Sequence, residues 1–351
     1  MITGFILHNG RLQQIKIEEQ KDIIKEMIWI DLIDPTEEER LLVENHYKFE
    51  LPEKAEIKDI EASARFYEDD DGIHIHSFFL NDFEDSATNV TVAFSIFAGC
   101  LFTIRDEDLS SFRLYRLRAR HPTVNDMDNV VNAMDILVGL HETAVEHVAD
   151  ALEGIYSRLE HVSRDVLDYT KQSSGGDNAS SSELKKLKKE IKQEMKEAEQ
   201  ESKAKMGEIL VCIAREEDIN GKARLSLMDT RRSLSFLVRG RLLNDAQNED
   251  VREILRDLES LTGHTSFLFD KINFLLEAAM GQISLEQSRI IKIFSIASVV
   301  FLPPTLIASI YGMNFSVMPE LNFPYSYPLS IAGMFLSGIA PYLLFKKKGW
   351  L

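Results

Sequence analysis

The chain has 351 residues, of which 57 are acidic and 40 are Lys or Arg, and its formal net charge is −17. This excess of acid argues against a nucleic-acid partner and favours cationic ligands, although a soluble acidic surface would explain it equally well. A hydrophobic content of 44% is enough to bury a sizeable core in two or three structural units. The sequence shows no recognisable set of nucleophile, base and orienting group and no phosphate-binding loop motif, so we do not expect an enzyme.

Residues 1–125 have the pattern of an α/β domain. The dipeptide Asn9-Gly10 separates two apolar-rich runs, which indicates a β-hairpin. The turn-forming residues at 70–72 and 98–99 separate further strand-like runs. Thr36 begins a capping-box sequence, which predicts a short helix after Pro35. We therefore expect a mixed domain of strands and short helices at the start of the chain.

From about residue 126 the pattern becomes helical. Within the region 126–248, residues 127–169 and 206–239 predict two long antiparallel helices. Between them, residues 171–205 form a flexible charged insert to which we assign no chemistry. It begins as a Ser- and Gly-rich linker and continues as a Lys- and Glu-rich helix nearly free of apolar side chains. Residues 249–311 predict a stalk helix that continues into the first of two apolar segments.

Two charge-free apolar segments, 293–311 and 321–345, lie near the C-terminus. About 20 apolar residues cross the hydrocarbon of a bilayer, so these segments predict a two-helix transmembrane hairpin; a buried soluble hairpin is the alternative. Basic residues flank the hairpin and predict that both ends of the chain are cytoplasmic, with the loop 312–320 outside. These residues are Arg289 and Lys292 before it, and Lys346, Lys347 and Lys348 in the tail 346–351.

Hydroxyl side chains form a stripe along the first apolar segment. At 100° per residue, every Ser and Thr between residues 284 and 310 falls within an arc of about 100°. These residues are Ser284, Ser288, Ser295, Ser298, Thr305 and Ser309. Ile291 and Leu302 share this face, as expected of a water-filled pore with apolar constrictions, but a helix-packing seam would look the same. Two spans cannot enclose a pore, so conduction would require a ring of identical subunits.

The loop after this segment provides the most specific signal. It reads Tyr311-Gly312-Met313-Asn314-Phe315, then Met318-Pro319-Glu320-Leu321, and the chain ends in a basic tail with Trp350-Leu351. This combination resembles the CorA family of magnesium transporters, and most closely the branch of enteric and related bacteria. The resemblance also includes residues 58–66 and 286–308 and covers most of the chain. It implies a homopentameric, multi-pass Mg²⁺ channel of the bacterial inner membrane.

The resemblance assigns roles to individual residues. It gives ion selectivity to Gly312, Met313 and Asn314, and a cation-attracting role at the mouth to Glu320. Regulatory Mg²⁺ would bind between neighbouring subunits at Asp59, with Asp257 as its partner. Together with the stripe, the resemblance predicts a pore lined by Ser288, Ile291, Phe294, Ser295, Ser298, Leu302, Thr305 and Ser309. Family members often have Asn where this chain has Ser288, so the polar ring is kept with a shorter reach.

These assignments suit Mg²⁺, which holds its waters tightly and is best met through its hydration shell. Neutral carboxamide and carbonyl oxygens can hold the hydrated ion weakly enough to release it. The membrane potential would drive entry, because two charges gain about 4.6 kcal/mol per 100 mV. Falling internal Mg²⁺ would empty the regulatory sites and open the pore. Co²⁺ and Ni²⁺ are expected secondary substrates; a zinc transporter and a non-conducting scaffold are the alternatives.

Two other groups of residues have the composition of metal sites. Asp69, Asp70 and Asp71 could bind a cation, but a charged hairpin tip explains them better. His74 and His76 alternate with isoleucines and so point from one face of a strand. They could form a zinc pair, but without further ligands we expect surface residues.

Overall fold

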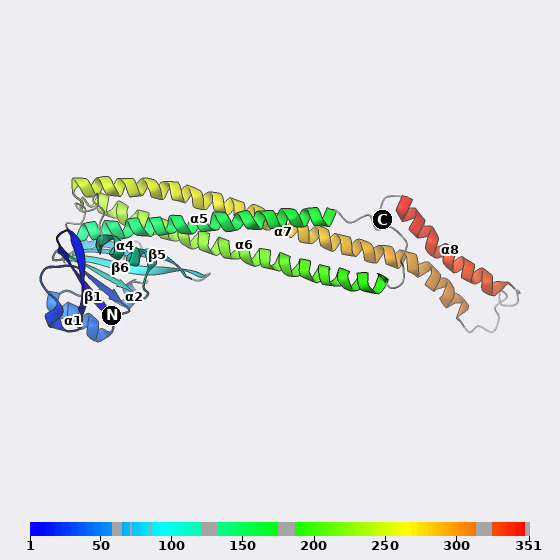
Figure 1. Ribbon diagram of the computed structural model, residues 1–351, viewed down its shortest axis with the longest axis horizontal. Coiled ribbons are helices and arrows are strands. Elements are labelled where there is room, and N and C mark those ends of the chain that lie inside the picture. Colours follow the sequence, from blue (N-terminus) through cyan, green and yellow to red (C-terminus); the bar gives the residue numbers. More distant parts are fainter. Residues whose placement is uncertain are drawn as a thin grey trace. The chain divides into compact units, whose positions relative to one another are not determined.

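The computed structural model describes residues 1–57, 65–70, 72–83, 86–120, 132–174, 187–313 and 325–347. The chain forms two compact units, Met1–Leu276 and Glu277–Leu351. The first contains the sheet and most of the helices, and the second contains the end of one long helix and the last helix (Figure 1).

The described part of the first unit contains a seven-stranded mixed sheet in the order β2-β1-β3-β7-β6-β5-β4. Only β3 and β7 pair in parallel; the other neighbours are antiparallel. The strands are β1 (Ile2–His8), β2 (Arg11–Ile17), β3 (Met27–Ile33), β4 (Phe66–Asp69), β5 (Gly72–Phe83), β6 (Ser86–Phe97) and β7 (Cys100–Arg105).

The predicted hairpins are confirmed. Asn9 and Gly10 both have positive φ, 52° and 72°, which suits the tight turn between β1 and β2. Gly72 pairs with Asp69 where β4 meets β5, and Ala98 and Gly99 lie between the paired residues Phe97 and Cys100 where β6 meets β7. The turn-forming residues in the sequence thus fix the register of the β1–β2, β4–β5 and β6–β7 pairs.

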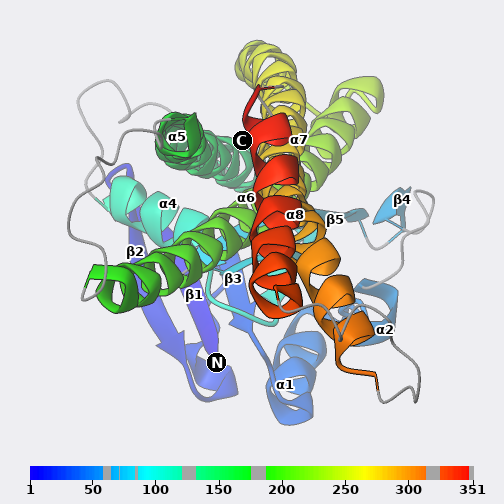
Figure 2. The ribbon, with the colours of Figure 1, turned by 90° about the vertical axis from the view of Figure 1, so that its right-hand side faces the viewer.

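Helices cover both faces of the sheet, in three layers. The short helices α1 (Glu37–Tyr47) and α2 (Lys54–Ile57) lie on one side, where Tyr47 and Phe49 pack against Phe102. On the other side, α4 (Ser110–Arg120) brings Phe112 against Trp29. Figure 2 shows α4 and α1 on opposite sides of the strands. As predicted, Thr36 caps α1, since its side chain accepts the Glu39 N–H while Glu39 accepts the Thr36 N–H.

Three long helices extend from this domain: α5 (Ala133–Ser174), α6 (Leu187–Arg239) and α7 (Asp245–Tyr311). Helix α6 joins the Lys- and Glu-rich helix predicted in the insert to the helix predicted over 206–239 in one continuous helix, because the sequence there consists of good helix formers. Of the predicted insert, residues 175–186 lie outside the described residues. Polar contacts join α5 and α6. For example, Arg158 Nε on α5 donates to Oε1 of the buried Glu216 on α6 at 2.6 Å.

A buried ion pair ties the sheet to α6. Arg65, just before β4, donates to Asp229 on α6 at 2.5 Å, and its Nε donates to the carbonyl of His76 on β5 at 3.2 Å. The same carboxylate oxygen accepts the backbone N–H of Phe78 at 3.1 Å. Both charged side chains are almost fully buried. Charges this deep are tolerated only when paired and hydrogen-bonded.

The second unit contains the end of α7 and helix α8 (Ser326–Lys347). Among the residues described, one helical segment is long and apolar enough to cross a membrane, Ser326–Phe345, and it is not buried within the chain. A shorter apolar stretch, Ser298–Tyr311, ends α7. The predicted first segment therefore ends at Tyr311, as expected. In the second predicted segment the helix begins at Ser326, and residues 321–324 lie outside the described residues.

Candidate ion pathway

The hydroxyl stripe lies on an exposed face of α7. The side chains of Ser284, Ser288, Ser295, Ser298, Thr305 and Ser309 are all exposed in the single chain. Several of the hydroxyls donate to the carbonyl four residues earlier: Ser288 to Ser284 at 2.9 Å, and Thr305 to Phe301 at 2.7 Å. Such a bond satisfies the donor inside the helix and leaves the oxygen lone pairs free to face water or an ion.

Helix α8 packs on the opposite face of α7. A Cβ built on Gly338 of α8 would lie 3.3 Å from Pro304 Cγ and 3.5 Å from the Val300 carbonyl oxygen. At 100° per residue, Val300 and Pro304 lie about 150–170° from the centre of the stripe. The stripe is therefore not the seam between the two helices of one chain.

Apolar side chains on the same face are equally uncovered. Ile291 is 65% exposed and Leu302 is 66% exposed, values similar to those of other apolar side chains on α7 and α8 such as Phe301. They lie one on each side of Ser295 and Ser298, so hydroxyl and aliphatic side chains alternate along the stripe. The side chain of Phe294 lies outside the described ones. This face can line an aqueous path with apolar constrictions, or pack on a neighbouring copy.

The predicted selectivity residues lie where α7 ends. The Gly312 N–H donates to the Ala308 carbonyl at 2.9 Å and the Met313 N–H donates to the Ile310 carbonyl, so both residues extend the last helical turn. Met313 is 49% exposed. Asn314 and Glu320 lie outside the described residues. In the basic tail, Lys347 is exposed at the end of α8, the side chain of Lys346 is not described, and Lys348 lies outside the described residues.

The predicted regulatory site is only half described. Asp257 lies on α7 in the first unit with its side chain exposed, which leaves it available to a partner. Asp59 lies outside the described residues.

The two histidines on β5 are buried, and the expectation of surface residues was wrong. His74 is 3% exposed and His76 is 0% exposed, and the rings of Phe49 and Tyr67 stack on the His74 ring. His74 is held by Ser95 at 3.0 Å and Asp69 at 3.2 Å. Burial lowers the pKa of His76 to about 4. Within the described ranges, no three His, Cys, Asp or Glu side chains are grouped to hold a metal.

The acidic residues near the β4–β5 turn fit a hairpin tip. Asp69 pairs across the turn with Gly72 and also contacts the His74 ring. Asp70 is exposed in the turn, and Asp71 lies outside the described residues. One of the three carboxylates thus already has a partner within the chain.

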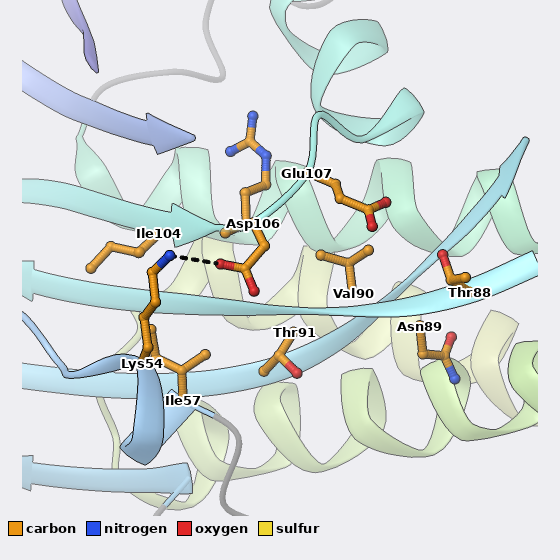
Figure 3. A pocket seen from close by; sticks show the side chains of 10 residues that line it. Lys54, Ile57, Thr88, Asn89, Val90, Thr91, Ile104, Asp106 and Glu107 are labelled. Atoms are coloured by element: carbon orange, nitrogen blue, oxygen red, sulfur yellow. Dashed lines mark ion pairs between the residues drawn. The ribbon is translucent and has the colours of Figure 1, made fainter. Parts of the chain in front are cut away.

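A pocket of about 170 Å³ lies on the sheet domain, between α2, β6 and the end of β7. Figure 3 shows Lys54 reaching across it to Asp106, at 3.7 Å, with Thr88, Asn89 and Thr91 along one wall. Lys54 also pairs with Asp34 at 2.9 Å, and Glu107 accepts from Asn81. Because Lys54, Asp106 and Glu107 each already have a polar partner within the chain, this pocket is a poor candidate for a ligand-binding site.

Solved structures define the fold class. The structure of the CorA magnesium transporter from Methanocaldococcus jannaschii superposes with a TM-score of 0.70 at 18% identity, covering 100% of this chain and 99% of that one. The cytoplasmic domain of ZntB from Vibrio parahaemolyticus gives 0.53 at 10% identity over 80% of this chain. At these identities the likeness establishes the fold alone: an α/β domain with long helices.

Sequence comparison then gives the family. The profile of the CorA-like Mg²⁺ transporter proteins matches residues 25–178 and 178–347. The magnesium transport proteins CorA of Escherichia coli K12 and Yersinia pseudotuberculosis are 48% and 47% identical to this chain, over the full length of both partners. The chain belongs to the CorA family, as the loop motif predicted, and its similarity to enteric proteins agrees with the expected branch. The family is described as one of transporters, in keeping with the absence of a recognisable catalytic set.

Two features escaped the reasoning from sequence. The contact between Gly338 and Pro304 joins residues 34 positions apart in sequence, and the pair Arg65–Asp229 joins residues 164 apart. A glycine in a membrane helix and an arginine among acidic residues have many ordinary explanations, so neither could be singled out. The one signal that could have indicated Asp229 is a charged residue at a position of α6 where the helical pattern calls for a buried side chain.

Proposed function

We propose that this chain is a subunit of a homopentameric Mg²⁺ channel in the bacterial inner membrane. Its membership in the CorA family and its full-length identity to proteins named for magnesium transport support the substrate. The end of α7 and helix α8 form the transmembrane hairpin. The loop 312–320 lies outside, and both chain termini, with the regions 1–125 and 126–248, lie in the cytoplasm.

The exposed stripe on α7 is the observation that carries this proposal. Its hydroxyl and aliphatic side chains face away from α8, as a helix does when it lines a pore shared by several copies. The exposed α8 side chains, such as Phe335 and Leu336, are apolar and suit contact with lipid. In this arrangement α7 forms the inner ring and α8 the outer ring.

Selectivity resides at the outer end of α7. Carbonyls of Gly312 and carboxamides of Asn314, repeated around the ring, hold Mg²⁺ through its water shell, while Met313 completes the turn. Glu320 raises the local concentration of cations. The membrane potential supplies about 4.6 kcal/mol per 100 mV for an entering divalent ion. Co²⁺ and Ni²⁺ pass as secondary substrates.

Internal Mg²⁺ regulates the pore through Asp59 and Asp257 of neighbouring subunits. Facing carboxylates repel one another when empty and are bridged by a bound divalent ion. The exposed position of Asp257 on α7 supports this role, because α7 continues as one helix to the stripe. Loss of the ion at low internal Mg²⁺ loosens the seams and widens the constrictions at Ile291 and Leu302.

The filter assignment is tested in liposomes containing the purified channel and a Mg²⁺ indicator. Asn314→Ala abolishes Mg²⁺ influx driven by a negative interior, while the protein elutes at the oligomer position in size-exclusion chromatography. The matched control is Ser330→Ala on α8, a substitution away from the stripe, with influx like the wild type. Normal influx through Asn314→Ala overturns the filter assignment.

The pore face is tested by cysteine accessibility. In a background with Cys100 and Cys212 replaced by Ser, Ser295→Cys and Thr305→Cys react with a water-soluble thiol reagent, and the reaction blocks Mg²⁺ influx. Phe335→Cys, on the exposed side of α8, reacts only with a lipid-soluble reagent. Equal protection of all three positions from the water-soluble reagent refutes the aqueous pore.

The alternative proposal keeps the same fold and makes Zn²⁺ the main substrate. Competition of Zn²⁺, Co²⁺ and Ni²⁺ with Mg²⁺ influx separates these substrates. A non-conducting scaffold predicts no ion flux at any internal Mg²⁺ concentration.

A further inference from the structure

Two prolines interrupt the hydrogen bonding of α7 at the level of the Leu302 constriction. Pro303 and Pro304 lie inside the helix. Because proline has no N–H, Pro304 cannot donate to the carbonyl of Val300, its partner four residues earlier. The helix is therefore softer here than above or below, and its direction depends on what it packs against.

Helix α8 packs against α7 at these prolines, and the α8 residue in contact there is Gly338. A Cβ on Gly338 would lie 3.3 Å from the Pro304 ring and 3.5 Å from the Val300 carbonyl oxygen. The first distance is shorter than an ordinary contact, so a side chain at position 338 requires the Pro304 ring to move by a few tenths of an ångström. The missing side chain of Gly338 thus lies beside the carbonyl whose helical donor is missing.

The face of α8 around Gly338 is the one turned inward. The partly covered positions Met334, Ser337, Gly338 and Pro341 follow a helical spacing, whereas the neighbouring Leu336 and Ile339 are exposed. The contact with Pro304 therefore lies within the packed seam of the helix pair. Leu302 lies on the other side of α7, so a push on Pro304 from α8 is directed toward the stripe.

We propose that Gly338 is a positioning residue of the channel, whose missing side chain lets α8 set the bend of α7 at Pro303–Pro304 and thereby the width at Leu302. The proposal rests on the proposed function, since it assumes that the stripe lines the pore. Gly338 does not touch the ion; it acts through Pro304. A side chain at 338 pushes α7 toward the stripe and narrows the constriction.

The test compares Gly338→Val with Gly333→Val. Both glycines lie on α8 and both substitutions have the same effect on helix propensity, but a Cβ at Gly333 meets nothing within 4 Å. In liposomes at low internal Mg²⁺, Gly338→Val lowers the maximal Mg²⁺ influx about tenfold, the size expected of overpacking, with the KM for external Mg²⁺ unchanged. Gly333→Val stays within about twofold of the wild type.

Rescue distinguishes positioning from simple damage. Adding Leu302→Ala to Gly338→Val restores most of the influx, because the shortened side chain reopens the passage, whereas a misfolded helix pair is not repaired by trimming Leu302. Equal influx through the two valine variants overturns the proposal. So does a loss of influx in Gly338→Val that Leu302→Ala fails to restore.

Hydrogen exchange separates this proposal from the proposed function. In detergent, the α7 peptide spanning residues 299–311 exchanges faster in Gly338→Val than in Gly333→Val, whether or not the protein conducts. Absence of Mg²⁺ influx in the wild type refutes the proposed function alone. Equal exchange of that peptide in both variants refutes the contact at Gly338.

Discussion

Removing the Asp229 carboxylate should destabilise the first unit far more than removing an exposed acid. In Asp229→Ala, the guanidinium of Arg65 remains buried without its ion-pair partner, and the Phe78 N–H loses its acceptor. Breaking a buried pair from one side costs about 3–5 kcal/mol. The carbonyl of His76 still accepts from Arg65 Nε at 3.2 Å, so part of the hydrogen bonding survives and we expect the lower half of that range.

The measurement is the apparent melting temperature of the full chain in detergent, followed by intrinsic fluorescence. A loss of about 3 kcal/mol corresponds to a decrease of roughly 6–12 °C for a unit of this size. The matched control is Glu160→Ala, which breaks the pair with Arg164, whose side chains are 64% and 62% exposed. An exposed pair is worth about 0–1 kcal/mol, so this variant should melt within about 3 °C of the wild type.

A double variant decides whether the cost arises from the unpaired charge. Arg65→Ala with Asp229→Ala removes both charges and should melt above Asp229→Ala alone, since no uncompensated guanidinium remains. The reasoning fails if Asp229→Ala melts like Glu160→Ala, or if the second substitution lowers the melting temperature further by its full single-variant effect.

Three further predictions concern the same unit. Burial lowers the pKa values of His76 and His141 to about 4, below the unfolded value. Each histidine therefore makes the free energy of unfolding fall as the pH drops from about 6.5 toward 4, by up to about 1.4 kcal/mol per pH unit. His141→Leu should reduce the dependence of the melting temperature on pH across that window, and an unchanged slope would contradict the burial argument. Gly72→Ala should lower the free energy of unfolding by more than about 2 kcal/mol, because its Cβ would lie 2.1 Å from the Ile96 carbonyl oxygen at a φ of 120°. The control Gly99→Ala, where a Cβ meets open space, should melt several degrees higher than Gly72→Ala. Equal melting temperatures would refute the clash. Thr36→Ala should cost about 1 kcal/mol through loss of the α1 cap, whereas Thr36→Ser should restore the melting temperature.

The features that could be predicted from the sequence are mostly those that depend on interactions between residues close together in the chain. The turn residues at Asn9-Gly10, the cap at Thr36 and the end of α7 at Tyr311 all depend on interactions within a few residues, so the sequence contains the complete signal. The loop motif after Tyr311 identified the family for a similar reason, because its residues are contiguous in the chain.

Periodicity found the hydroxyl stripe but not its surroundings. The spacing of Ser288, Ser295 and Thr305 places them on one side of α7 whatever the helix packs against. It cannot say whether α8 covers that side, because the covering residues come from another segment. The position of Gly338 against Pro304 showed that α8 packs on the other side.

The sequence by itself determined the first hairpin, the cap of α1, the long helices, the apolar segments and the family, since these depend on neighbours along the chain. Only the tertiary structure decided that His76 is buried, that Arg65 pairs with Asp229, and that the stripe on α7 is left uncovered by α8. Burial and ion pairing depend on contacts between distant segments, and a side chain's own position in the sequence does not specify which segment will lie beside it.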